Sequence, residues 1–93
     1  MQRIFKYEIA RKENRYQTLQ LPVGAVFRHA EGLGTRMHVW YQVDDQAPVE
    51  TRTFYVAGTG SQIPEDLGTF LGTVTCMAGQ FRGHIYEAPN QKG

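Results

Sequence analysis

Short runs of alternating apolar and polar residues recur along this chain, and they constrain its fold more than any other feature. The clearest run is Met37–Val43, which is dense in β-branched and aromatic residues and places Val39, Tyr41 and Val43 on one side. A two-residue period of this kind is typical of a β-strand that buries one face. The run therefore predicts a central strand.

Six further runs have a similar character, and turn-forming residues separate them at intervals of roughly ten residues. They cover residues 3–9, 16–21, 25–30, 50–57, 70–77 and 80–87. No long helical period is present, although Ile63–Leu67 has the proline and acidic residues that suit a first helical turn. The pattern predicts an all-β fold, a small antiparallel sandwich or open barrel of about seven strands, with at most one short helical turn.

The chain has 93 residues, which is enough for one small hydrophobic core. We predict a single β domain over residues 1–88 and a flexible C-terminal tail over residues 89–93. The apolar side of each run supplies the predicted core. Its members are Phe5, Leu19, Leu21, Val39, Val43, Phe54, Val56, Leu71, Val74 and Ile85.

The net charge and the composition limit which binding partners and which cellular compartment are expected. The formal net charge of +1 provides no broad positive field, so we expect no binding to duplex DNA. Cys76 is the only cysteine, which fits a reducing compartment. No apolar run approaches the roughly 20 residues that span a bilayer, and Met1–Lys6 lacks an apolar signal core. A cytoplasmic protein without a membrane partner is expected.

Motifs for catalysis and metal binding are missing from the sequence. The three histidines lie on separate runs, and Cys76 has no CxxC partner. Ser61 does not belong to a G-x-S-x-G motif, and the adjacent Glu65 and Asp66 are more typical of a capped or solvated turn. We therefore predict a binding protein rather than an enzyme, with no catalytic residues, metal ligands or cofactor.

The turn Gly58-Thr59-Gly60-Ser61 has two interpretations. Glycines on both sides of Thr59 allow positive φ and expose backbone amides, which is how a chain can present N–H groups to an anion. The sequence lacks the lysine of a P-loop. The other interpretation is a corner turn that needs glycine only for its backbone geometry.

Arginines and aromatic residues are interleaved on the predicted strands. Guanidinium groups of Arg28, Arg52 and Arg82 are candidates for pairing with phosphate oxygens. Trp40 and Tyr55 are candidates for stacking on a base. The simpler alternative is that these residues belong to the core or to the solvated faces of the sheet.

Several motifs together resemble a family of small, largely uncharacterised proteins encoded by tailed phages and prophages. The motifs are Trp-x-x-Val-Asp at 40–44, Arg-Thr-Phe at 52–54, Gly-Thr-Gly-x-x-Ile-Pro at 58–64, Leu-Gly-Thr at 71–73 and His-Ile-Tyr-Glu at 84–87. The resemblance covers most of the chain.

This resemblance implies a phage accessory protein that acts in the cytoplasm of an infected host cell. Two functions compete. One is a sponge that sequesters a small nucleotide second messenger of host antiviral defence, with a cyclic dinucleotide as the expected ligand. The other is an inhibitor of a host defence protein, or a structural accessory protein, that acts through a sheet edge. Exposed edges also favour a homodimer or higher homo-oligomer.

Overall fold

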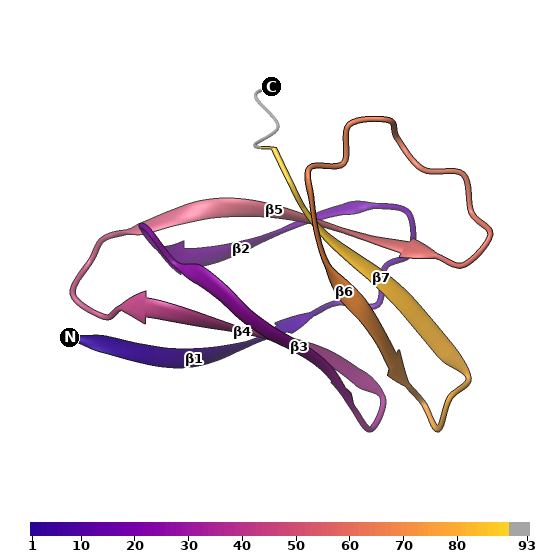
Figure 1. The fold of residues 1–93 in the computed structure, drawn as a ribbon, viewed down its shortest axis with the longest axis horizontal. Coiled ribbons are helices and arrows are strands. Elements are labelled where there is room, and N and C mark those ends of the chain that lie inside the picture. The colour runs from indigo at the N-terminus through magenta and orange to yellow at the C-terminus, as the bar shows by residue number, and fades with distance from the viewer. Residues whose placement is uncertain (90–93) are drawn as a thin grey trace.

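A computed structural model describes residues 1–89 of the chain, and these residues form seven strands in two antiparallel sheets (Figure 1). The strands are β1 (Gln2–Ile9), β2 (Tyr16–Pro22), β3 (Val26–Leu33), β4 (Arg36–Asp44), β5 (Val49–Gly58), β6 (Thr69–Cys76) and β7 (Phe81–Ala88). The described residues contain no helix, and Ile63–Leu67 lies in the irregular loop between β5 and β6. The all-β prediction is confirmed. Pro89 belongs to the predicted tail, and the rest of that tail lies outside the described residues.

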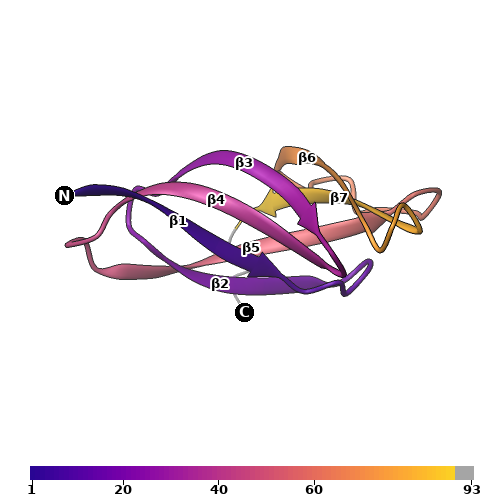
Figure 2. The same cartoon turned by 90° about the horizontal axis from the view of Figure 1, so that it is seen from below.

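The two sheets pack face to face as a small sandwich. One sheet has the strand order β1-β4-β3 and the other the order β2-β5-β7-β6. Seen along the layers, β1, β3 and β4 lie over β2 and β5 (Figure 2). Strand β4 is the centre of the first sheet, and β5 and β7 are the inner strands of the second.

The core fills the space between the sheets and contains most of the predicted residues. Leu21, Val39, Val43, Phe54, Val56, Val74 and Ile85 are buried. Leu19 and Leu71 are partly buried and pack against this cluster. Ile9, Met37 and Tyr41 complete it, with at most 1% of each exposed.

The prediction that Phe5 belongs to the core is wrong, because 38% of its side chain is exposed. Phe5, Tyr7 and Ile9 point to the same side of β1, yet only Ile9 is fully buried. Strand β1 is an edge strand, and the facing sheet covers only its C-terminal end. The alternation of apolar and polar residues predicted the side of β1 on which Phe5 lies. It could not predict how far along β1 the four-stranded sheet covers that side.

Strand β3 departs from strict alternation. Alternation would place His29 on the side of Phe27 and opposite Arg28, but the register shifts between Phe27 and His29. Phe27 packs against the core, whereas Arg28 donates to Gln42 Oε1 from Nε and Nη2 at 3.0 and 2.8 Å. His29 packs beside Trp40 on that same outer face. A β-bulge therefore puts two consecutive side chains outside.

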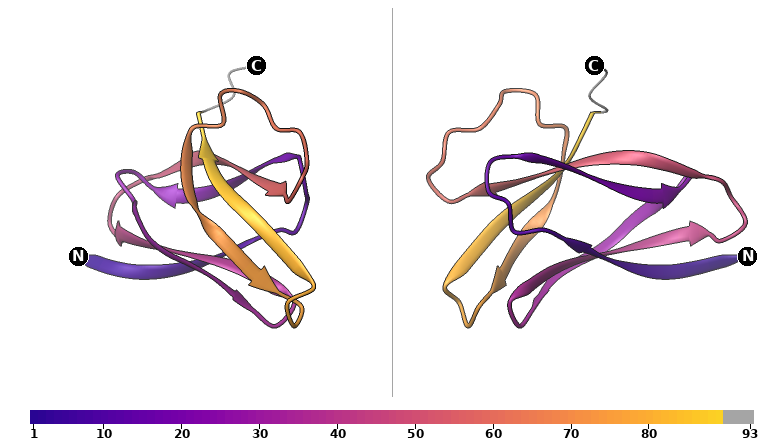
Figure 3. Two further views of the ribbon diagram at one scale, coloured as in Figure 1. Left: turned by 45° about the vertical axis from the view of Figure 1, so that its right-hand side comes forward. Right: turned by 180° about the vertical axis from the view of Figure 1, so that it is seen from behind.

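The sandwich is closed on one side by the approach of β3 to β6. A Cβ at Gly32 would lie 2.0 Å from the carbonyl oxygen of Thr75, so glycine is required for this contact. The amide of Met77 also donates to the carbonyl of Gly34 at 2.7 Å. The tips of the β3–β4 and β6–β7 hairpins lie side by side in Figure 3.

Phe54 provides a test of the core. Replacing it with alanine should lower the free energy of unfolding by about 3–5 kcal/mol, because its side chain is fully buried between the sheets. Phe70→Ala is the matched control, since 52% of Phe70 is exposed and its loss should cost much less. Urea unfolding of both variants measures the difference. Equal losses would contradict the assigned core.

Candidate functional site

The structure distributes the predicted site residues over three places. Arg52 lies between the sheets, and its guanidinium contacts residues of both. Arg28 and Trp40 lie on the outer face of the three-stranded sheet. The others are on or beside the outer face of the four-stranded sheet: Tyr55, Gly58, Thr59, Gly60, Ser61 and Arg82.

The Gly58–Ser61 segment is a β-turn in which the amide of Ser61 donates to the carbonyl of Gly58 at 3.1 Å. Gly60 has a φ of 84°, while Thr59 has a negative φ, so the signs match a type II turn. Glycine at position 60 therefore has a geometric reason independent of any ligand. The corner-turn interpretation accounts for this part of the motif.

Asn14 holds this turn from the β1–β2 connection. Its backbone amide donates to the carbonyl of Val56 at 2.7 Å, and its side-chain amide donates to Ser61 Oγ at 3.1 Å. The amide of Gly58 points at Asn14 Oδ1 at 3.5 Å. Because Gly58 and Ser61 direct their amides within the chain, an anion at this turn would meet Thr59 and Gly60.

His84 connects the turn to the neighbouring strand. Its Nε2 lies 2.8 Å from Thr59 Oγ1, and its Nδ1 lies 2.9 Å from Thr73 Oγ1. On the same face of β7, Arg82 Nε donates to Thr75 Oγ1 at 3.3 Å and is otherwise exposed. The sequence analysis did not assign His84 a ligand role, although its alternation with Arg82 and Tyr86 in the last strand was visible.

Arg82, His84 and Tyr86 form what we call the β7 row, because alternate residues of a strand share one face. Neighbouring members are about 6.7 Å apart along the strand. Thr73 and Thr75 pair with His84 and Arg82 and add two hydroxyl groups beside the row. The result is a polar, basic strip that ends in an aromatic ring.

Four aromatic residues cross the outer face of the four-stranded sheet in one register. Tyr16 pairs with Tyr55, Tyr55 with Tyr86, and Tyr86 with Phe70. Tyr55 packs in a cluster with Leu67, and only 4% of it is exposed, so it has no free face for a base. Phe70 is 52% exposed, and its ring centroid lies 5.3 Å from that of Tyr86. Tyr16 is 41% exposed at the other end of this line, next to Tyr55. Phe70, with the partly buried Tyr86 beside it, is therefore the exposed ring next to the β7 row.

Arg28 and Trp40 cannot contribute to this strip in one copy of the chain. Trp40 lies between His29 and His38, with ring centroids 5.3 and 6.0 Å away. This surface is the outer face of the three-stranded sheet, and the core separates it from the β7 row. A ligand of nucleotide size would contact one face or the other.

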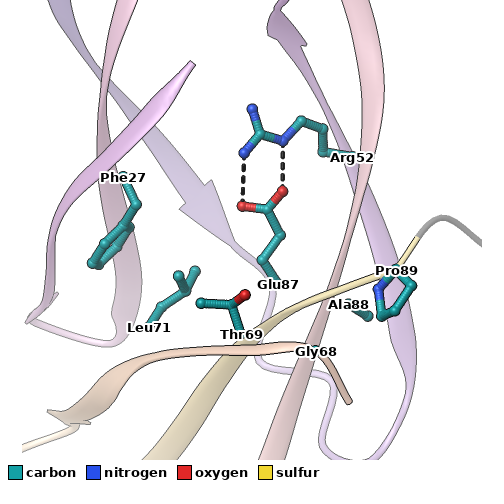
Figure 4. Close-up of a pocket in the computed structure, with 8 residues that line it drawn as sticks. All are labelled: Phe27, Arg52, Gly68, Thr69, Leu71, Glu87, Ala88 and Pro89. Atoms are coloured by element: carbon teal, nitrogen blue, oxygen red, sulfur yellow. Dashed lines mark hydrogen bonds and ion pairs between the residues drawn. The ribbon is translucent and has the colours of Figure 1, made fainter. Parts of the chain in front are cut away.

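Arg52 is committed to an ion pair with Glu87 (Figure 4). Arg52 Nε and Nη2 donate to the two oxygens of Glu87 at 2.5 and 2.8 Å, and Nη1 donates to the carbonyl of Ala25 at 2.9 Å. The Tyr41 hydroxyl donates to Glu87 Oε1 at 2.7 Å. The guanidinium also lies 5.3 Å from the centre of the Tyr41 ring. This network joins β5 and β7 of one sheet to β4 of the other.

The ion pair lies at one side of a cavity of about 370 Å³. Phe27 and Leu71 provide apolar walls, and Gly68, Thr69, Ala88 and Pro89 complete the lining (Figure 4). The hydrogen bond to Glu87 raises the pKa of Arg52, so Arg52 keeps its charge. A phosphate entering here would have to displace Glu87 from Arg52. The geometry therefore favours a structural role for Arg52.

Removing the carboxylate tests that role. Glu87→Ala should lower the free energy of unfolding by roughly 3 kcal/mol, since it removes the hydrogen-bonded partner of Arg52 and leaves that charge with only the more distant Glu50. This is the low end for buried pairs, because 18% and 20% of the two side chains stay exposed. Glu50→Gln is the control, as Glu50 lies 3.8 Å from Arg52 and is more exposed. Chemical unfolding that gives equal small losses would contradict the assignment.

The raised pKa of Tyr41 predicts that the folded protein loses stability at alkaline pH. Burial, followed by the hydrogen bond to Glu87, raises the pKa of Tyr41 above its ordinary value of about 10. The unfolded chain therefore releases this proton at a lower pH than the folded chain. The contribution is complete below about pH 10 and declines as the pH rises further. Thermal unfolding between pH 8 and 12 should show a steeper loss for the wild type than for Tyr41→Phe; parallel curves would contradict it.

The described residues 1–89 contain no group of three or more histidine, cysteine, aspartate or glutamate residues placed to hold a metal ion. They also include no helix long and apolar enough to cross a bilayer.

The fold and surface define a small antiparallel β-sandwich domain with a basic and aromatic strip on one sheet. A family model described as a domain of unknown function, DUF7352, matches residues 1–93, and the chain belongs to that family. Neither a curated protein nor a solved structure matches the chain.

Proposed function

We propose that this protein binds a small nucleotide without chemistry, on the outer face of β6 and β7. The observation that carries the proposal is the β7 row, in which Arg82 and His84 are followed on one face by Tyr86. A guanidinium suits phosphate, and an aromatic ring suits a base. Arg82 and Tyr86 are about 13 Å apart along the strand, a separation that a dinucleotide can span.

The phosphate end of the proposed site combines one guanidinium with threonine hydroxyls. Arg82 makes a single long hydrogen bond to Thr75, which an incoming phosphate can replace with charge-assisted bonds. His84 contacts the hydroxyls of Thr59 and Thr73.

The base end is formed by Phe70 and Tyr86. Phe70 is a large apolar side chain with more than half of its surface in water, so its ring is accessible to a base. Stacking a base on such a ring contributes about 1–3 kcal/mol. Phe70 and Tyr86 thus replace Tyr55 and Trp40, the residues predicted from the sequence to stack on a base.

The resemblance to phage proteins supports a biological role for nucleotide binding. We propose that the protein sequesters a cyclic dinucleotide of host antiviral defence in the cytoplasm of the infected cell and releases it unchanged. A sponge of this kind needs a dissociation constant near or below micromolar, which corresponds to about −8 kcal/mol. Two stacked bases and two phosphates make that affinity attainable.

Calorimetry with a panel of cyclic and linear dinucleotides tests the proposal. The wild type should bind at least one of them, and Arg82→Ala and Phe70→Ala should each weaken binding by about tenfold or more, since each removes a contact of order 1–3 kcal/mol. Arg28→Ala is the matched control, because Arg28 lies on the opposite face.

The bound nucleotide should be recovered intact after heating. Recovery of linear products from a cyclic ligand would instead reveal a phosphodiesterase. Failure to bind any member of the panel would overturn the nucleotide proposal and favour the alternative, an inhibitor or accessory protein that binds another protein through a sheet edge. Equal weakening by Arg28→Ala would contradict the assigned face.

A further inference from the structure

We propose that two copies of this chain pair through the free edges of their β1 strands, antiparallel and with Phe5 of each copy opposite Phe5 of the other. The inference does not depend on nucleotide binding. It rests on the state of the four sheet edges and on the sequence of β1.

Strand β1 is a regular edge with neither proline nor a bulge, although it carries the charged residues Arg3, Lys6 and Glu8. Its register with β4 runs without a bulge from Gln2↔Asp44 to Ile9↔Met37, so its other side presents an unbroken row of backbone groups. A flat, uninterrupted edge of this length is a template for another strand.

Each of the three other edges carries a bulge or a proline, although in β2 the proline is the last residue. Strand β3 carries a bulge between Phe27 and His29 and lies against β6 at Gly32. Strand β6 has its own bulge between Phe70 and Gly72. Strand β2 ends in Pro22. These devices limit edge pairing in natural sheets, which leaves β1 as the edge available to a partner.

Two apolar side chains of β1 are exposed at the part of the strand that the four-stranded sheet does not cover. Phe5 faces the interior side of its sheet yet is 38% exposed, and Ile4 on the other face is 54% exposed. At the far end of the strand, the amide and carbonyl of Ala10 are hydrogen-bonded to the side chain of Gln17. The free edge is therefore the segment from Gln2 to Glu8, and Phe5 is its midpoint.

A second copy is the occupant because this segment is self-complementary about Phe5. A two-fold axis there places Phe5 against Phe5, Arg3 against Tyr7, Ile4 against Lys6 and Gln2 against Glu8, without opposing like charges. Moving the axis one residue to Lys6 would put the two lysines opposite each other. The Phe5-centred register also uses the whole free segment and covers the exposed ring.

Introducing a negative or a positive charge at position 5 tests both the pairing and its register. In sedimentation velocity, the wild type should have twice the 10.6 kDa chain mass at micromolar concentration. Phe5→Glu and Phe5→Lys should each be monomeric, because the axis brings like charges together. An equimolar mixture of the two variants should recover the dimer. Val49→Glu is the control, since Val49 is 64% exposed away from β1 and its variant should remain dimeric.

A cysteine at the axis keeps the proposal testable if the charged variants do not fold. Opposed strand residues have Cα atoms about 4.5–5.5 Å apart, which is within the range of a disulfide. Phe5→Cys should therefore give a covalent dimer on oxidation. Gln2→Cys should not, because the two copies of position 2 would lie about 20 Å apart along the paired strands.

A monomeric wild type at all concentrations would overturn the proposal. So would a dimer that persists in both charged variants, or cross-linking that is faster for Gln2→Cys than for Phe5→Cys. Monomeric single variants whose mixture does not dimerise would overturn the Phe5-centred register. Each measurement is made without nucleotide, so its result stands apart from that of the ligand panel.

Discussion

The interaction on which this sandwich depends is the ion pair between Arg52 and Glu87, closed by the hydroxyl of Tyr41. Arg52 and Glu87 belong to adjacent strands of one sheet, and Tyr41 comes from the centre of the other. Arg52 donates to both oxygens of Glu87, and the Ala25 carbonyl accepts a further donor of Arg52. The Arg52–Glu87–Tyr41 network thereby connects the two sheets beside the cavity.

Strand β7 links that network to the proposed binding face. Its inward residues Ile85 and Glu87 are held by the core and by the ion pair, which restrains the adjacent outward residues His84 and Tyr86. His84 and Tyr86 therefore stand on a rigid inner strand rather than on a loop. Side chains supported in this way hold their positions without ordering on binding, which lowers the entropy cost of capturing a ligand.

Sequence patterns predicted the fold class and most of the core, because the two-residue period reports directly which side of a strand is buried. They could not predict the bulge after Phe27 or the exposure of Phe5, since both depend on which strands are neighbours. Arg52 carried a usable signal, as a charge on the same side as Phe54 and Val56 needs a partner. The partner, Glu87, is 35 residues away and could not be identified without the topology.

We propose that this protein binds its ligand at the β7 row. An NMR titration of the labelled protein with a cyclic dinucleotide, following backbone amides and aromatic side chains, tests this site. We expect the largest shifts at Phe70, Arg82, His84 and Tyr86, with little change around Arg28 and Trp40. Shifts concentrated on Arg28 and Trp40, or the lack of shifts at saturating ligand, would contradict it.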